Sequence, residues 1–244
     1  AIVPFILFVY WLFYLVVEKK EFFRTLKFAL VTVGCYLFLN LWWIVNFLAD
    51  VIQKASVIRE VAAFSAVGTT GMVDFFRFLG CWAWRTRHYQ MPYFPYAHFY
   101  DEPFLLLLSF SIPLFAFLAV FLKPKDKNIC FFSFLAIIGL FLAKGTATPF
   151  GFLYQWLWEN FPGFWIFREP FSKFTPITLL SYSVLLGFSV DLLYQKTRNW
   201  QARQKKGYQS FWPSLIPIIT IIIILIVSYP LLTGEAIWDK WNGS

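Results

Sequence analysis

The chain has 244 residues, of which 59% are hydrophobic, 23% aromatic and only 14% charged, and its mean hydropathy is +0.63. Soluble domains carry about 25% charged residues, so this composition excludes an ordinary soluble enzyme, and it is too apolar for a disordered chain. The formal charge of +8 would suit a nucleic-acid partner, but the basic residues lie beside long apolar runs, which favours membrane topology and no nucleic-acid partner.

Six apolar segments approach the length of about 20 residues that a bilayer crossing requires. In chain order they are Ala1–Val17, Phe28–Leu48, Pro103–Leu122, Ile129–Ala143, Thr175–Tyr194 and Pro213–Leu232. The sequence therefore predicts an all-α fold, a polytopic bundle of about six transmembrane helices. Because the chain starts inside an apolar run, without a methionine or a basic leader, we expect a transmembrane fragment of a larger protein.

The basic residues predict the orientation in a plasma or inner membrane. Twelve of the 21 lysine and arginine residues fall in three short segments, 18–27, 123–128 and 195–212. The positive-inside rule places these loops in the cytoplasm. The two longer segments, 49–102 and 144–174, then lie on the extracytoplasmic face.

The first outer loop has the pattern of helices that rest on the membrane surface. Apolar residues recur at helical spacing between Val51 and Ala62, with charged residues on another side. A turn at 68–71 separates this segment from a second expected helical stretch, Met72 to Trp84.

The same loop contains both histidines of the chain and a weak metal-site candidate. His88, His98 and Asp101 are residue types that bind metals, but no regular spacing supports a site. We favour solvated histidines among interfacial aromatic residues, and we assign no metal site and no cofactor. A requirement for a divalent metal stays open.

The second outer loop predicts a short interfacial helix. Thr148 can cap a helix, Pro149 is tolerated at the first helical position, and the helix would run to about Asn160. An apolar stripe begins at Phe150 and includes Tyr154. About twelve residues are too few to cross a bilayer, so we expect this helix to lie along the surface.

Charged residues flank this expected helix. Lys144 precedes it, and Arg168, Glu169 and Lys173 follow it. Cations near a membrane surface and a helix N-terminus could bind a phosphate or pyrophosphate head group, since arginine offers a planar fork and lysine a mobile charge. The same residues could instead anchor the protein to lipid head groups. Spacing alone leaves both interpretations open.

The run from Ala143 to Phe174 also carries a resemblance. Its Lys-Gly-Thr, Pro-Phe-Gly, Leu-Tyr-Gln-Trp-Leu, Pro-Gly-Phe and Phe-Arg-Glu-Pro elements, with Lys-Phe shortly after, resemble bacterial multi-spanning glycosyltransferases of the GT-C superfamily, in particular the alpha-(1→3)-arabinofuranosyltransferase family. Over about thirty residues the likeness is tight. The family's closing element has aspartate where this chain has Glu169, and this chain has one additional residue before Lys173.

The resemblance implies a helical membrane enzyme that transfers a sugar, arabinofuranose in the family that the chain resembles, from a polyprenyl-phosphate donor to a glycan acceptor on the outer face. It implies that Arg168 and Lys173 bind the donor phosphate, with Lys144 assisting and Glu169 in support. Trp156, Trp158 and Trp165 could stack on sugar rings, but we favour interfacial anchoring as the explanation of these tryptophans. The catalytic carboxylates of the superfamily lie nearer the N-terminus, so the catalytic residues stay unknown.

Two other classes of function remain as alternatives. A lipid-linked glycan transporter or flippase would tend to carry charges within its spans or internal symmetry, and no charged residue lies centrally in a predicted span. A non-catalytic membrane subunit of a cell-envelope assembly complex would share the same composition. An upstream outer loop with paired acidic residues would favour the transferase.

Overall fold

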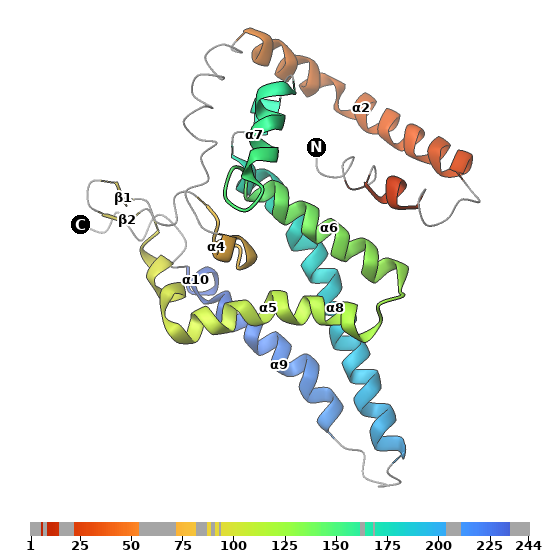
Figure 1. The fold of residues 1–244 in the computed structure, drawn as a ribbon, viewed down its shortest axis with the longest axis vertical. Coiled ribbons are helices and arrows are strands. Elements are labelled where there is room, and N and C mark those ends of the chain that lie inside the picture. Colours follow the sequence, from red (N-terminus) through yellow and green to blue (C-terminus); the bar gives the residue numbers. More distant parts are fainter. Residues whose placement is uncertain are drawn as a thin grey trace. The chain divides into compact units, whose positions relative to one another are not determined.

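The computed structural model describes residues 6, 9–14, 22–53, 72–81, 87–88, 91–92, 94–161, 164–167, 169–203 and 211–234. By its contacts the chain divides into two compact units. One unit contains residues 1–68 and 137–178, and the other contains residues 69–136 and 179–244. Helices make up nearly all of the regular structure in the described ranges (Figure 1), so the prediction of a helical fold is confirmed.

Three helices are long and apolar enough to cross a membrane. They are α2 (Phe22–Gln53), α5 (Pro103–Leu122) and α8 (Pro170–Arg203). Two further apolar helices, α6 (Lys127–Ala143) and α9 (Trp212–Val227), have 17 and 16 residues, fewer than the about 20 that a crossing requires. The described residues therefore contain three of the six expected spans at full length. The first expected span lies mostly outside the described residues, of which 9–14 are helical.

The helices extend beyond the apolar segments that predicted them. α5 has the predicted bounds, but α8 starts five residues before the expected Thr175 and continues to Arg203. α2 begins at Phe22, inside the segment expected to form a cytoplasmic loop. Lysine, arginine and glutamine are good helix formers, so a helix continues where the hydropathy of a span ends. The expected loops 18–27 and 195–212 are thus partly helical.

A proline divides the last expected span. α9 ends at Val227, and the short helix α10 (Tyr229–Leu232) follows after Ser228. Pro230 has no N–H to donate to the carbonyl of Ile226, four residues earlier, and its ring crowds that carbonyl. The helix therefore breaks before the proline.

The described part of the segment between α2 and α5 differs most from the structure expected for it. Of the stretch expected to be helical from Met72 to Trp84, the structure describes residues 72–81, in which the helix is α4 (Met72–Phe76) and Phe78 has a left-handed backbone with φ of 62°. A two-residue antiparallel pair, β1 (Arg87–His88) with β2 (Met91–Pro92), and the 3-10 helix η3 (Pro95–Asp101) follow. The interfacial helix expected between Val51 and Ala62 lies largely outside the described residues.

Hydrogen bonds join the helices of the second unit. α5 packs against η3 and α9 (Figure 1). The phenol of Tyr100 in η3 donates a hydrogen bond to the carbonyl of Val227, at 2.5 Å, and Ser189 on α8 donates to the carbonyl of Ala116, at 3.2 Å. A small core of Leu79, Ala97 and Tyr100 lies beside these contacts.

An aspartate fixes the start of α6. The Asp126 carboxylate accepts hydrogen bonds from the backbone N–H groups of Asn128 and Ile129, at 3.0 and 3.4 Å, as an N-cap residue does. Lys123 lies 2.8 Å from the other carboxylate oxygen, and its hydrogen bond lowers the pKa of Asp126 below the usual range. The short loop between α5 and α6 is therefore held by one acidic side chain.

In the first unit, α6 and α8 approach closely at a glycine. A Cβ atom at Gly139 would lie 2.5 Å from the Oγ1 atom of Thr178 and 3.0 Å from its backbone nitrogen. Small residues let helix backbones approach in this way, as they do in membrane helix pairs. Gly139 is thus required by packing rather than by backbone conformation.

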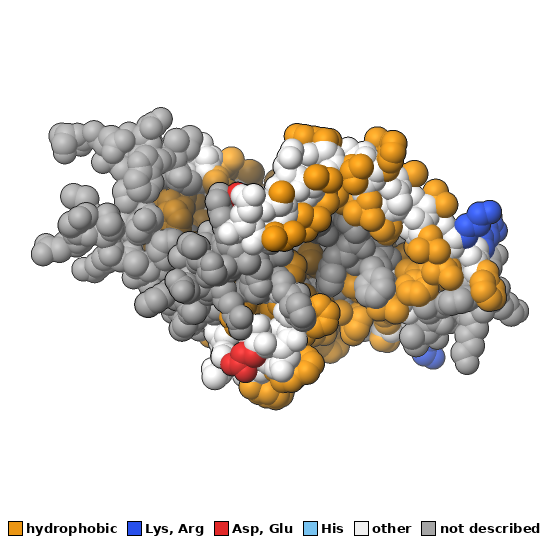
Figure 2. Space-filling model, turned by 90° about the horizontal axis from the view of Figure 1, so that it is seen from above, with side chains coloured by type: hydrophobic (Ala, Val, Ile, Leu, Met, Phe, Trp, Pro, Cys, Tyr) orange, Lys and Arg blue, Asp and Glu red, His pale blue; other side chains and the backbone are white. Residues whose placement is uncertain are grey.

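Hydrophobic side chains cover much of the described surface (Figure 2). On α2 no described residue is buried, and Phe38 and Trp42 are 77% and 75% exposed. A helix that is apolar on all sides is typical of the interior of a large protein or of a membrane span. The exposed apolar helices are compatible with a membrane protein.

Candidate functional site

Two of the expected site residues, Glu169 and Lys173, lie at the start of α8. Glu169 immediately precedes Pro170, the first residue of the helix, where proline is tolerated because its missing N–H would have no helical partner. The backbone N–H of Lys173 donates to the Glu169 carbonyl at 3.3 Å, which closes the first turn. Lys173 is therefore part of α8 and not of the loop before it. Arg168 lies outside the described residues.

Glu169 and Lys173 differ in their surroundings. The Lys173 side chain is exposed, whereas Glu169 is half-buried. Ser172 donates its hydroxyl to the carbonyl and the carboxylate of Glu169, at 3.0 and 3.3 Å. A carboxylate is favoured at a helix N-terminus, and one turn further along the exposed ammonium remains available to an anion.

Tyr154 anchors the helix that precedes this site. Its side chain is fully buried in α7 (Gly151–Asn160), and its hydroxyl donates a hydrogen bond to the carbonyl of Phe167, at 2.8 Å. Phe167 ends η4 (Phe164–Phe167), directly before position 168. Burial raises the pKa of the Tyr154 phenol, so this group remains a hydrogen-bond donor at physiological pH.

A series of aromatic ring contacts connects Tyr154 to α8. Tyr154 meets Phe164 edge-on with ring centroids 5.1 Å apart, Phe164 lies 5.3 Å from Phe167, and Phe167 lies 5.0 Å from Phe174 on α8. Ring pairs at these separations stabilise beyond the area they bury. α7, η4 and the first turns of α8 therefore form one packed support around residues 168–173.

Lys144 has a different environment from Lys173. It is 3% exposed, and its ammonium donates hydrogen bonds to the carbonyls of Ala147, at 2.8 Å, and Pro149. The charge also lies 5.0 Å from the ring centroid of Phe141, within range of a cation–π interaction. Burial lowers the pKa of the Lys144 ammonium. The ammonium holds the loop before α7.

This lysine also explains why α7 starts later than expected. The predicted start with Thr148 as cap and Pro149 in the first turn is wrong, because α7 begins at Gly151 and Phe150 has a left-handed backbone with φ of 62°. The carbonyl of Pro149 accepts from Lys144 and not from a helical N–H. The end at Asn160 agrees with the prediction.

The expected apolar stripe of α7 is only partly covered. Tyr154 is buried, whereas Phe150 and Leu153 are 60% and 43% exposed. Trp156 is also exposed, and the Trp165 side chain lies outside the described residues. α7 is a separate ten-residue helix, too short to cross a bilayer.

The weaker candidates from the first outer loop belong to the other unit. His98 is exposed and stacks on Phe99 with ring centroids 4.2 Å apart, and Asp101 is exposed at the end of η3. The side chain of His88, in β1, lies outside the described part. Among the described residues, no group of three or more histidine, cysteine or acidic residues could hold a metal ion.

The sequence interpretation missed a buried ion pair in the same unit. Arg77 and Asp74 are 5% and 6% exposed, with a guanidinium nitrogen 3.6 Å from the carboxylate. Arg77 also donates to the Ser109 hydroxyl, at 2.7 Å, and to the carbonyl of Tyr100. The available signal was an aspartate and an arginine three residues apart in an otherwise apolar stretch, because buried charges are rarely found without partners.

The chain was compared with known protein families, curated proteins and solved structures. No protein-family model, no curated protein and no solved structure matches this chain.

Proposed function

We propose that this chain is part of a membrane glycosyltransferase that takes a sugar from a polyprenyl-phosphate donor and passes it to a glycan acceptor on the extracytoplasmic face. The observation that carries the proposal is the exposed Lys173 on the first turn of the long apolar helix α8. If α8 crosses the membrane, its first turn lies at head-group depth, where the phosphate of a lipid-linked donor also lies.

The proposed chemistry assigns separate roles to the charged residues. Transfer from a phosphate leaving group requires cations that neutralise the charge developing on the leaving oxygen. Arg168 and Lys173 supply them. Glu169 supports the turn between them, and Lys144 contributes by holding the loop before α7. The base that activates the acceptor hydroxyl is not assigned to a residue of this chain.

Arg168→Ala should lower donor use at least about tenfold, because it removes one or two charge-assisted hydrogen bonds to phosphate, each contributing about 1.5–3 kcal/mol. Arg168→Lys should restore only part of this loss, since the planar fork is absent. The measurement is transfer of a radiolabelled sugar from a polyprenyl-phosphate donor by the full-length protein in membranes. Lys125→Ala, an exposed lysine in the loop between α5 and α6, is the control. Equal apparent donor affinity in all variants at matched protein levels would refute the assignment.

The proposed orientation has its own test. In a background without the three native cysteines, cysteines placed at Lys125 and Lys205 should be protected from an impermeant thiol reagent added to intact cells. Cysteines at Arg87 and Glu159 should react, because the basic loops are expected in the cytoplasm. Labelling of the first two positions would place the proposed donor site on the wrong face.

A further inference from the structure

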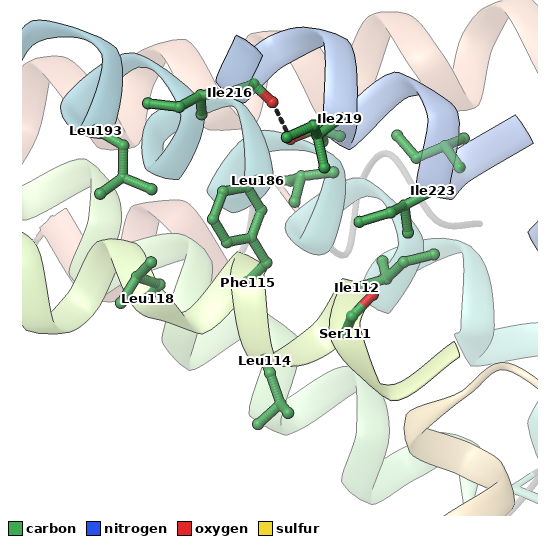
Figure 3. Close-up of a pocket in the computed structure, with 12 residues that line it drawn as sticks. Ser111, Ile112, Leu114, Phe115, Leu118, Leu186, Leu193, Ile216, Ile219 and Ile223 are labelled. Carbon is green, nitrogen blue, oxygen red and sulfur yellow. Dashed lines mark hydrogen bonds between the residues drawn. The ribbon is translucent and has the colours of Figure 1, made fainter. Parts of the chain in front are cut away.

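The second unit contains an apolar groove between three helices. α5, α8 and α9 line a cavity of about 500 Å³, which falls within the range of about 300–1,000 Å³ typical of ligand pockets. In Figure 3, Phe115, Leu186 and Ile219 point into the space from the three helices. Leu118, Leu193 and Ile216 lie towards one end, and Ile112 and Ile223 towards the other.

The polar groups in this groove have partners within their own helices. The hydroxyl of Thr220 donates to the carbonyl of Ile216, at 2.9 Å, and that of Ser111 donates to the carbonyl of Leu108, at 2.6 Å. With both hydroxyl hydrogens used, the groove presents hydrocarbon. A polar occupant would lose its hydrogen bonds to water without replacement.

One end of the groove adjoins a basic pocket. Leu122, one helical turn beyond Leu118, and Leu192, next to Leu193, line this second pocket of about 510 Å³. It continues along α8 past Lys196 and Asn199 to Arg203. In the part of the chain that the structure describes, neither cation has an ion pair or a hydrogen bond.

Two exposed tryptophans lie at the end of the groove that adjoins the basic pocket. Trp200 lines the basic pocket and is 59% exposed. Trp212, which begins α9 one turn before the groove residue Ile216, is 69% exposed. Exposed tryptophans beside lysine and arginine at the ends of apolar helices are typical of the membrane–water interface. The basic pocket therefore lies at head-group depth if these helices cross a bilayer.

The distance along α8 from the groove to the basic pocket matches the thickness of one lipid leaflet. Along α8, ten residues separate Leu186 in the groove from Lys196 in the basic pocket, about 15 Å at the helical rise of 1.5 Å per residue. Half of a hydrocarbon core about 30 Å thick is also about 15 Å. A lipid chain in the groove would thus bring its own head group to the two cations.

We propose that this groove and the basic pocket together form a binding site for one anionic phospholipid, with an acyl chain between α5, α8 and α9 and the phosphate at Lys196 and Arg203. Charge selects the head group, because the described helix α8 contains a single acidic residue, Asp191, and its carboxylate accepts a hydrogen bond from Gln195, at 2.8 Å. Two unpaired cations with an exposed tryptophan fit a phosphodiester, and a purely apolar groove fits its chain. The site is separate from the proposed donor site and does not depend on it.

The occupant can be identified by photo-crosslinking in the full-length protein. A photoreactive amino acid at Ile219, reconstituted in vesicles of phosphatidylglycerol and phosphatidylcholine at equal amounts, should give an adduct with the mass of one phospholipid, predominantly phosphatidylglycerol. A crosslinked dimer would show that a second copy fills the groove, and a crosslink within the chain would show that another segment does. Either result would overturn the proposal.

Matched variants test the two halves of the site. Lys196→Gln with Arg203→Gln should weaken phosphatidylglycerol binding, measured by native mass spectrometry, by about tenfold or more. The control, Arg198→Gln with Lys125→Gln, removes the same charge outside the pocket and should change phosphatidylglycerol binding less than twofold.

A second pair of variants tests the apolar groove. Ile223→Trp should fill the groove and reduce phosphatidylglycerol binding, whereas Ile222→Trp, on the same helix but outside the groove, should not. Equal phosphatidylglycerol binding by each variant and its control would overturn the site, whatever the result of the sugar-transfer assay.

Discussion

Replacing Arg77 by alanine should lower the free energy of unfolding by about 3–5 kcal/mol, the typical cost of breaking a buried ion pair by removing one of its members. The guanidinium joins three segments of the second unit, because it contacts Asp74 in α4, the Tyr100 carbonyl in η3 and Ser109 in α5. Alanine would remove all three contacts and leave the Asp74 carboxylate buried. Thermal or denaturant unfolding in detergent measures the change.

A surface pair of the same spacing is the matched control. Lys123 and Asp126 are also three residues apart, but the Lys123 side chain is 56% exposed, so Lys123→Ala should cost less than about 1 kcal/mol. Combining Arg77→Met with Asp74→Asn should cost less than the sum of the two single changes, because the double variant buries no charge at either position. If Arg77→Ala is no more costly than Lys123→Ala, the buried network does not stabilise the fold.

Gly151→Ala should destabilise the first unit by about 1–3 kcal/mol, as expected for an added methyl group in a site without space. The new Cβ atom would lie 2.0 Å from the carbonyl oxygen of Thr146 and 2.6 Å from its carbonyl carbon. These are backbone atoms, which cannot rotate aside as a side chain can. The Lys144 ammonium holds two carbonyls of the same loop, so relief would require breaking its hydrogen bonds.

Gly187→Ala gives the comparison for this variant. Gly187 also lies in a helix, but apart from its chain neighbours and the backbone of its own helix no heavy atom lies within 4 Å of its added Cβ atom. Alanine there should be neutral or stabilise by up to about 1 kcal/mol through its helix propensity. The unfolding temperatures of the two variants in one detergent separate crowding from propensity, and equal shifts would contradict the packing argument.

Hydropathy and local capping signals predicted much of the helical pattern. α5 has the expected bounds because Pro103 can occupy its first turn and Pro124, two residues after Leu122, disfavours a helical backbone at Lys123. The bounds of α8 were missed because hydropathy measures the preference for lipid, whereas Lys196 and Arg203 favour helix without favouring lipid. The late start of α7 depends on the hydrogen bond from Lys144 to Pro149, which no local pattern indicates.

In the candidate site and in the buried Arg77 network, too, features encoded by neighbouring residues could be predicted and contacts between distant segments could not. The charged segment around Glu169 and Lys173 could be singled out because its residues are neighbours in the sequence, although the start of α8 at Pro170 was not predicted. The Arg77 network could not, because its partners Tyr100 and Ser109 lie 23 and 32 residues further along the chain. Single-sequence patterns report such long-range pairs poorly, since nothing local fixes which segments meet.

The unequal lengths of the apolar helices have a consequence for the lipid around them. With 17 and 16 residues, α6 and α9 reach about 26 and 24 Å, whereas the 34 residues of α8 reach about 51 Å. A hydrocarbon core about 30 Å thick is too thick for the first two, whereas it matches the 20-residue apolar segment of α8, Thr175–Tyr194, which is also about 30 Å long. The remaining turns of α8 would therefore project into the interface, and lipids beside α6 and α9 would compress if these two helices cross the membrane. Membranes of short-chain lipids would relieve that compression, and bilayer thickness thereby becomes a variable that selects where such a chain resides.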